Sequence, residues 1–171
     1  GGPDGTLHAL YTITTWPCDP CDNDLYHAQR DAGGSWQGAV VQESRWGAPD
    51  DAYAHTPSLA ITSAGEPIVA AAYVTRAVTG SMKSSALIVY ARKDGVWCGE
   101  TVASQSDGYA GSDGTDFTGG TPVLALADDD RPFVAFTDLA YWHDANGSNG
   151  IPGQVRLAAR AGSGWVLGTL L

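Results

Sequence analysis

Two stretches of this chain are versions of one pattern: TPSLAITSAGEPIVA at residues 56–70 and TPVLALADDDRPFVA at residues 121–135. Thr, Pro, Leu, Ala, Pro, Val and Ala recur in them at a constant offset, which indicates an internal repeat. Each stretch has two apolar runs separated by a short polar turn. The pattern therefore predicts two antiparallel strands joined by a tight turn, once in each repeat.

A second repeated feature ends in a tryptophan. Three segments each place an alanine, a basic or polar residue, a glycine-bearing turn and then Trp: YHAQRDAGGSW (26–36), VYARKDGVW (89–97) and LAARAGSGW (157–165). The three tryptophans mark equivalent points of three repeats, 61 and 68 residues apart. Together with the first pattern, they predict a four-stranded antiparallel meander in each repeat.

The repeats assign four strands, A to D, to each unit. We expect strand A at 57–62 and 122–127, strand B at 7–12, 67–73 and 132–137, strand C at 25–30, 86–92 and 154–160, and strand D at 36–42, 97–102 and 165–171. The composition of 85–94 alone also allows a helix, but the matching Gly-Trp turns in three copies favour strands.

Repeats of four short strands with a tryptophan landmark are typical of a β-propeller, in which neighbouring blades cover each other's faces. The predicted fold is all-β, with about three blades. Partial blade 1 spans 1–42 and lacks strand A, blade 2 spans 56–102, blade 3 spans 121–171, and inter-blade loops span 43–55 and 103–120. Three blades do not close a ring of four to eight. We therefore expect further blades from the same polypeptide or from another subunit.

The pattern TPSLAI…GEPIVAAAY…LIVYARKDGVW…ETV resembles the repeats of bacterial secreted propellers in the broad sialidase-like, BNR-type group. This resemblance covers about two-thirds of the chain and implies the propeller fold and an extracellular or cell-surface location. The Asp box of true sialidases, S-x-D-x-G-x-x-W, is absent from the three Trp turns, and the sialidase arginine cluster cannot be traced. The resemblance therefore does not imply sialidase activity.

Charge excludes two classes of partner. The chain has 171 residues, with 19 acidic and 9 basic side chains and a formal net charge of −10. Such a charge repels nucleic acid and anionic lipid, and no apolar run approaches the roughly 18 residues that cross a bilayer. Sixteen of the acids are aspartates, which favour turns and oxygen-ligand sites.

The acids gather in the segments expected to form one face of the propeller. These segments are the B–C loops 13–24, 74–85 and 138–153 and the D–A connections 43–55 and 103–120. They hold eleven acidic and three basic residues, which accounts for −8 of the net charge. Long loops on a rigid scaffold are the usual place for binding. Aromatic side chains there are candidates for stacking on sugar rings: Trp16, Trp46, Tyr53, Tyr109, Tyr141 and Trp142.

Calcium is a weaker expectation, because aspartates in turns are often simply solvated. The segments SDGYAGSDGTD (106–116) and CDPCDND (18–24) are rich in aspartate, but neither matches the twelve-residue calcium loop that ends in glutamate. The candidate ligands are Asp22, Asp24, Asp107, Asp113 and Asp116.

The cysteines favour a disulfide over a metal or redox site. Cys18 and Cys21 form a C-x-x-C between strands, with no second pair for zinc and no βαβ context for thioredoxin-like chemistry. In a secreted protein this spacing suits a small disulfide-bonded loop, with free thiols as the alternative. Cys98 is expected to be a lone thiol.

No catalytic motif stands out. His8 and His27 fall in strands and are interpreted as packing residues, whereas His55 precedes strand A and His143 lies beside Trp142. If the chain is an enzyme, these last two histidines and the carboxylates of Asp116 and Asp138 are the candidates. A glycosidase needs two carboxylates about 5–10 Å apart, and the sequence alone gives no such geometry.

Three functions remain open at this point. The favoured one is a non-catalytic extracellular recognition or assembly module, which binds a glycan through the long-loop face. The first alternative is a secreted propeller glycoside hydrolase or polysaccharide lyase. The second is a purely structural subunit of a larger assembly, in which the acidic aromatic face contacts another protein.

Overall fold

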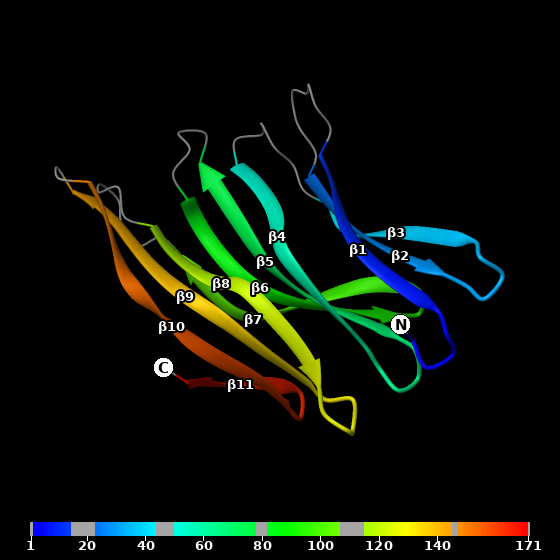
Figure 1. Ribbon diagram of the computed structural model, residues 1–171. Helices are drawn as coiled ribbons and strands as arrows, with labels where there is room; N and C mark the ends of the chain where they lie inside the picture. The colour runs from blue at the N-terminus through cyan, green and yellow to red at the C-terminus, as the bar shows by residue number, and fades with distance from the viewer. Residues whose placement is uncertain are drawn as a thin grey trace.

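A computed structural model describes residues 2–14, 23–43, 50–77, 82–106, 115–144 and 147–170, and these residues form three antiparallel sheets with no helix (Figure 1). Sheet 1 has the order β1-β2-β3: β1 (Leu7–Thr14), β2 (Asn23–Arg30) and β3 (Trp36–Gln42). Sheet 2 has the order β4-β5-β6-β7: β4 (Asp50–Ile61), β5 (Pro67–Ala77), β6 (Met82–Lys93) and β7 (Val96–Ser106). Sheet 3 has the order β11-β10-β9-β8: β8 (Thr115–Leu126), β9 (Pro132–Asp144), β10 (Gly147–Ala161) and β11 (Gly164–Thr169).

This architecture confirms the predicted all-β class and the antiparallel meanders of three, four and four strands. The helix considered for 85–94 is wrong, because these residues belong to β6 and the turn after it. In Figure 1 the sheets follow one another from sheet 1 (blue, right) through sheet 2 (cyan to green) to sheet 3 (yellow to red, left).

The strands are longer than the sequence predicted, and this corrects the expected loops. β5 runs to Ala77 and β6 starts at Met82, so most of the predicted B–C loop 74–85 is strand. Likewise, β9 and β10 fill most of 138–153, while β4 and β8 begin inside the predicted connections 43–55 and 103–120. The physical reason is that the hydrogen bonds between paired strands join backbone groups and do not depend on the type of side chain. Polar and glycine-rich residues can therefore extend a hairpin whose pairing begins in apolar residues.

Three turns show the internal repeat at the level of the backbone. The amides of Gly5, Gly65 and Asp130 donate to the carbonyl oxygens three residues before them, at 3.1, 2.9 and 2.9 Å. All three residues have positive φ, at 82°, 84° and 60° respectively. Glycine adopts this conformation without strain, and aspartate is one of the few other residues that tolerate it. The turn before β1 is therefore the same A–B turn that joins β4 to β5 and β8 to β9.

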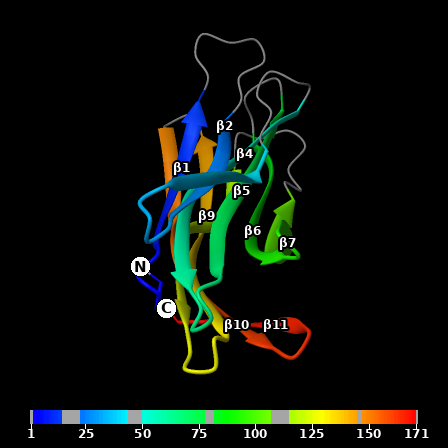
Figure 2. The same ribbon diagram turned by 90° about the vertical axis from the view of Figure 1, so that its right-hand side faces the viewer.

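Stacking of the sheets buries the core, and sheet 2 is buried on both sides. We call the face of a sheet that packs on the next sheet along the chain its forward face, and the opposite one its rear face. Ala70, Leu87 and Val89 on the forward face of sheet 2 pack against sheet 3. Residues of its rear face, including Val69 and Tyr90, pack against sheet 1. Figure 2 shows the strands of sheet 1 in front of those of sheet 2. Alternation along β5 thus supplies two separate cores from one strand.

The tryptophans occupy equivalent positions, as the repeat predicts. Trp36, Trp97 and Trp165 are each paired across strands with an arginine of the preceding strand. Trp97 and Trp165 lie on the rear faces of their sheets. Trp97 packs on the core between sheets 1 and 2, and Trp165 packs on the core between sheets 2 and 3. Trp36 is 54% exposed, because none of the described residues covers the rear face of sheet 1.

Truncation in the core between sheets 2 and 3 tests this packing. Leu87 is fully buried, so Leu87→Ala should lower the free energy of unfolding by about 2–5 kcal/mol. Val96, which is 64% exposed at the start of β7, is the matched control, and Val96→Ala should change stability by less than about 0.5 kcal/mol. Urea unfolding followed by tryptophan fluorescence measures both values, and equal effects would contradict the packing described here.

Candidate functional site

For many of the predicted site residues, the structure does not describe the position of the side chain. Those outside the described residues are Trp16, Cys18, Cys21, Asp22, Trp46, Asp107, Tyr109 and Asp113. For another group the structure gives the strand and its register only: Tyr53 and His55 in β4, Asp116 in β8, and Tyr141, Trp142 and His143 in β9. The disulfide between Cys18 and Cys21 therefore stays a prediction.

The register brings part of this second group together. Thr115 pairs with Tyr141, and Asp116 pairs with Ala140, so Asp116 and the Tyr141-Trp142 pair lie on neighbouring strands near one end of sheet 3. Tyr53 and His55 lie in the first half of β4, and β4 is packed against β8. The candidates of this group thus lie at the same end of three strands, β4, β8 and β9, and they belong to extended strands and not to the loops expected from the sequence.

Asp138 is the one catalytic candidate whose side chain is described. Its Oδ2 accepts a hydrogen bond from Nη1 of Arg156 at 2.8 Å, in an ion pair that joins β9 to β10. The guanidinium of Arg156 also lies 5.7 Å from the centroid of the Phe136 ring, which is buried in the core. This carboxylate is therefore already engaged in holding sheet 3 together.

Metal binding finds no support in the described part of the chain. Asp24 lies in β2, where it pairs with Ile13, and not in a loop. Within the described ranges, no three His, Cys, Asp or Glu side chains are grouped closely enough to hold a metal ion. Cys98, on β7, is exposed and carries a free thiol.

A pair of histidines lies between sheets 1 and 2. His8 Nδ1 and His27 Nε2 are 3.0 Å apart, so one ring donates a hydrogen bond to the other. The His27 ring also meets the edge of Trp97 at 5.4 Å between centroids. His27 is 2% exposed, which confirms it as a packing residue. Burial, with the nearby positive charges of His8 and Arg92, lowers the pKa of His27 to about 4.

A polar cavity opens beside this pair, in the crevice between sheets 1 and 2. Its volume is about 140 Å³, and its lining is His27, Gln29, Gln37, Gly38, Ala39 and Arg92. The Nη2 of Arg92 donates only a long bond, 3.4 Å, to the carbonyl of Gly95, and its Nε is buried with no partner. Among the described residues, no carboxylate lies within ion-pair distance of Arg92. The crevice therefore holds a guanidinium whose charge is not neutralised by any carboxylate in the described part of the chain.

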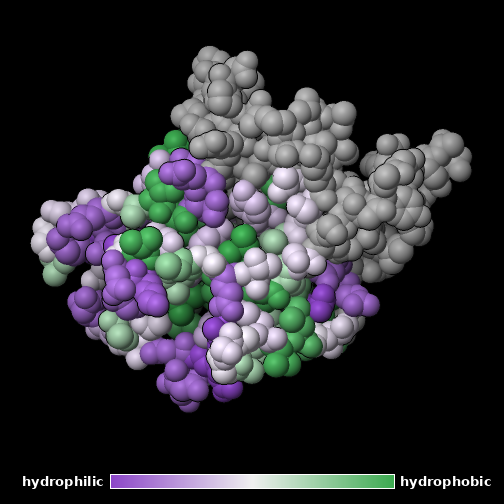
Figure 3. All heavy atoms as spheres, turned by 180° about the vertical axis from the view of Figure 1, so that it is seen from behind, coloured by the Kyte–Doolittle hydropathy of each residue, from purple (hydrophilic) through white to green (hydrophobic). Residues whose placement is uncertain are grey.

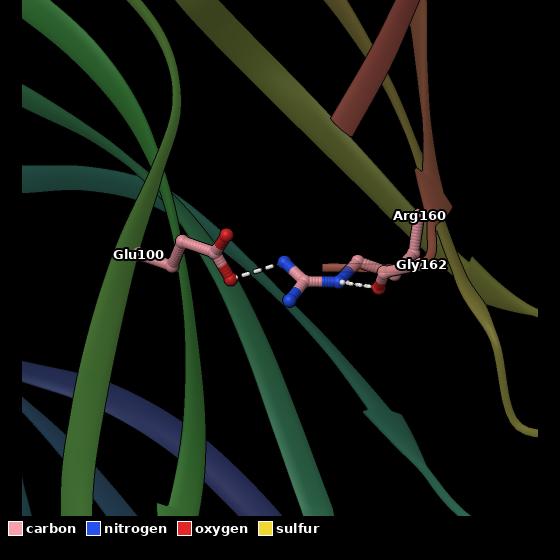
Figure 4. A network of polar contacts seen from close by, with 3 residues as sticks. All are labelled: Glu100, Arg160 and Gly162. Atoms are coloured by element: carbon pink, nitrogen blue, oxygen red, sulfur yellow. Dashed lines mark hydrogen bonds and ion pairs between the residues drawn. The ribbon is translucent and has the colours of Figure 1, made fainter. Parts of the chain in front are cut away.

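The crevice between sheets 2 and 3 has an arginine at the same position of the repeat, but this arginine is paired with an acidic side chain. Arg160 stands at the position of Arg92, with its guanidinium 5.5 Å from the ring centroid of Trp165. Its Nη1 donates to Oε2 of Glu100 on β7, and its Nε donates to the carbonyl of Gly162 at 3.2 Å (Figure 4). Here the arginine is neutralised by an acid from the facing sheet.

Sequence reasoning missed the first crevice. It used the segments around Gln29 and Arg92 only to locate the repeats, and it assigned no binding role to them. The available signal was a difference between repeats, since the position held by Glu100 in the second repeat is occupied by Ala39 in the first. Both residues lie three positions after the tryptophan of their repeat, so the difference is visible in the sequence, whereas the contact of Glu100 with Arg160 on the facing sheet is not.

Comparison with known proteins adds no identity. No protein-family model matches the chain, and no curated protein matches it. The likeness to sialidase-like repeats stays a hypothesis carried by the quoted motifs. In the described residues no helix is long and apolar enough to span a membrane.

The buried His27 predicts a specific dependence of stability on pH. Its folded pKa, about 4, is below the ordinary value of 6.5, so the unfolded chain binds this proton more readily than the folded one. The stability contributed by neutral His27 is therefore complete above pH 6.5 and is lost as the pH falls toward 4. The stability difference between the native chain and His27→Gln should change by roughly 1–3 kcal/mol over this range.

Urea unfolding at intervals between pH 7 and 4 measures that difference. Both proteins carry the same carboxylates, so the effect of carboxylate titration on stability cancels in the difference. A difference that is constant with pH would contradict the burial of a neutral imidazole.

Proposed function

We propose that this chain is an extracellular recognition and assembly module, made of three consecutive propeller blades whose two end faces pack on further sheets of the same kind. The observation that carries the proposal is the chemistry of the two end faces. Both are apolar and exposed, and both are equivalent by the internal repeat to faces that are buried between the sheets of this chain.

The rear face of sheet 1 is the first end face. Large apolar side chains that are at least 41% exposed line it: Leu7, Tyr11, Ile13 and Trp36. Tyr11 stacks on Tyr26 with 5.4 Å between ring centroids, which forms a flat aromatic surface. The equivalent rear face of sheet 2 buries Val69 and Tyr90. Isolated apolar residues are common on surfaces, but a continuous patch on a sheet face marks an interface.

The forward face of sheet 3 is the second end face. Val123 and Val166 are 60% and 61% exposed, and they alternate along β8 and β11 with residues packed toward sheet 2. In the register, Ala135 and then Leu157 follow Val123 across the sheet, while Val166 pairs with Ala159 and Ala159 pairs with Phe133. Apolar groups also reach the surface among polar ones on the back of the molecule, green among purple in Figure 3.

A second copy of this chain fits these two faces. The forward face of sheet 3 in one copy would meet the rear face of sheet 1 in the other, which continues the stacking seen between sheets 1 and 2 and between sheets 2 and 3. Such a contact joins different surfaces of the two copies, so it closes a ring or extends a stack. Two copies supply six sheets, within the range of closed propellers.

Recognition is proposed at the common end of β4, β8 and β9. The register places Asp116 beside the Tyr141-Trp142 pair there, and Tyr53 and His55 lie in the adjacent half of β4. Aromatic faces stack on sugar rings, while carboxylates accept hydrogen bonds from hydroxyls. This combination supports glycan binding, and it is also the place where a hydrolase or lyase would put its acids.

Charge substitution on the end faces tests the assembly. Tyr11→Lys disrupts only the rear face of sheet 1, and Val123→Lys disrupts only the forward face of sheet 3. Sedimentation velocity should show a self-associating native chain and a loss of closed rings or longer stacks in either variant, since both would need the altered face.

An equimolar mixture of the two variants then distinguishes this contact from others. One intact face of each kind remains in the mixture, so it should form one-to-one complexes through those two faces. Val96→Lys, on neither end face, should assemble like the native chain. A native chain that stays monomeric, or a mixture that forms no complexes, would contradict the proposal.

A glycan array followed by product analysis tests recognition. Specific retention without cleavage is the expected result, and Trp142→Ala should weaken it by about 1–3 kcal/mol without changing the melting temperature. Cleavage of a retained glycan would establish the enzyme alternative, with Asp116→Asn then expected to stop turnover. If no glycan is retained, the module is an assembly unit alone.

A further inference from the structure

The two crevices of this chain are built on the same cross-strand pairs, which makes them directly comparable. In sheet 1, His27 pairs with Ala39 and Gln29 pairs with Gln37. The corresponding pairs in sheet 2 are Val89 with Glu100 and Ala91 with Cys98. Even the irregularity that follows is shared, since the register shifts between Leu25 and Tyr26 and again between Leu87 and Ile88. Ala39 and Glu100 therefore occupy the same position of the repeat.

In both crevices the residue on the opposite wall is an arginine at the same position of the repeat. Arg92 pairs with Trp97 on sheet 2, and Arg160 pairs with Trp165 on sheet 3. In the crevice between sheets 2 and 3, the carboxylate of Glu100 crosses from one sheet to the other and binds Arg160. In the crevice between sheets 1 and 2, the methyl group of Ala39 stands where that acid would start, so the carboxylate is missing.

The crevice between sheets 1 and 2 has a cavity and hydrogen-bond donors at the place that the missing carboxylate would occupy. The cavity of about 140 Å³ has the volume of several water molecules, each of about 30 Å³. Arg92 brings the positive charge, with a buried Nε that has no partner among the residues that the structure describes. The amides of Gln29 and Gln37 add neutral donors and acceptors along the sheet 1 wall. His27, which forms part of the lining, is neutral at pH 7 and adds no charge.

We propose that this crevice is a binding site for the carboxylate of an acidic sugar, which takes the place on Arg92 that Glu100 takes on Arg160. A guanidinium is the side chain best suited to a carboxylate, because its planar donors bind both oxygens. The two glutamine amides match hydroxyl groups on the carbons next to the carboxylate. This site differs from the aromatic strand ends, and it depends neither on the assembly nor on the glycan binding proposed above.

The same comparison supplies a variant that fills the site from within. Ala39→Glu restores at the first crevice the acid that the second one contains, so Arg92 becomes paired without losing its own side chain. Ala39→Gln is the matched control, with the same length and no charge. Arg92→Gln removes the positive charge and keeps a polar side chain in the crevice.

Titration with glucuronate, followed in ¹H–¹⁵N spectra that include the Arg92 Nε–H and the glutamine side-chain amides, measures binding. We expect glucuronate to shift the Arg92 and glutamine resonances, acetate to shift the Arg92 signal more weakly, and glucose to shift neither. Ala39→Glu and Arg92→Gln should weaken glucuronate binding roughly 10- to 100-fold, because each removes a charge-assisted hydrogen bond to the ligand. Ala39→Gln should retain the native affinity within about threefold, which is less than 1 kcal/mol.

Several results would overturn the inference. They are no shift with glucuronate, equal shifts with glucose, or native affinity in Ala39→Glu. Acetate binding as tight as glucuronate binding would overturn the assignment to a sugar, since the amides then contribute nothing. Melting temperatures of all three variants identify any loss of binding that comes from unfolding.

Discussion

The stacking of sheet 2 between its two neighbours is the interaction on which the rest of this structure depends. β5 carries it, because residues 69–72 alternate between the two faces and are all fully buried. Their small or branched side chains let the neighbouring sheets approach closely on both sides. Burial on two faces removes more apolar surface from water than burial on one face, and this stabilises sheet 2. The crevices, the tryptophan positions and the two exposed end faces all follow from this arrangement.

Because the sheets repeat, differences between them carry the functional information. The A–B turns and the Arg–Trp pairs are common to all three repeats, and sheets 1 and 2 also share the register shift at Leu25–Tyr26 and Leu87–Ile88. These shared features maintain the scaffold. Where one repeat has Glu100 and another has Ala39, the scaffold is the same but the charge balance of the crevice changes. An internal repeat thus acts as its own reference, which is valuable for a chain that matches no family model.

The predictions from sequence succeeded where a pattern was repeated and failed where it was not. The paired TP-x-L-A stretches and the three Trp turns predicted the strands, their antiparallel order and the grouping into three units. The extents of the strands were wrong, because the polar and glycine-rich residues of 138–153 pair in β9 and β10 through backbone hydrogen bonds that side-chain patterns do not report. The role of Asp138 as a partner of Arg156 was also invisible, since it depends on a contact between two strands.

By itself, the sequence determined that the chain is all-β, that it consists of repeated antiparallel units, and that it carries a net charge of −10. These properties are local or additive: turn residues, apolar runs and charges act within a few residues or simply sum. Only the tertiary structure decided which side chains meet across the sheets. Arg92, which no described carboxylate pairs, the buried neutral His27 and the exposed Trp36 each depend on what the neighbouring sheet supplies. That is set by register and stacking between residues far apart in the chain.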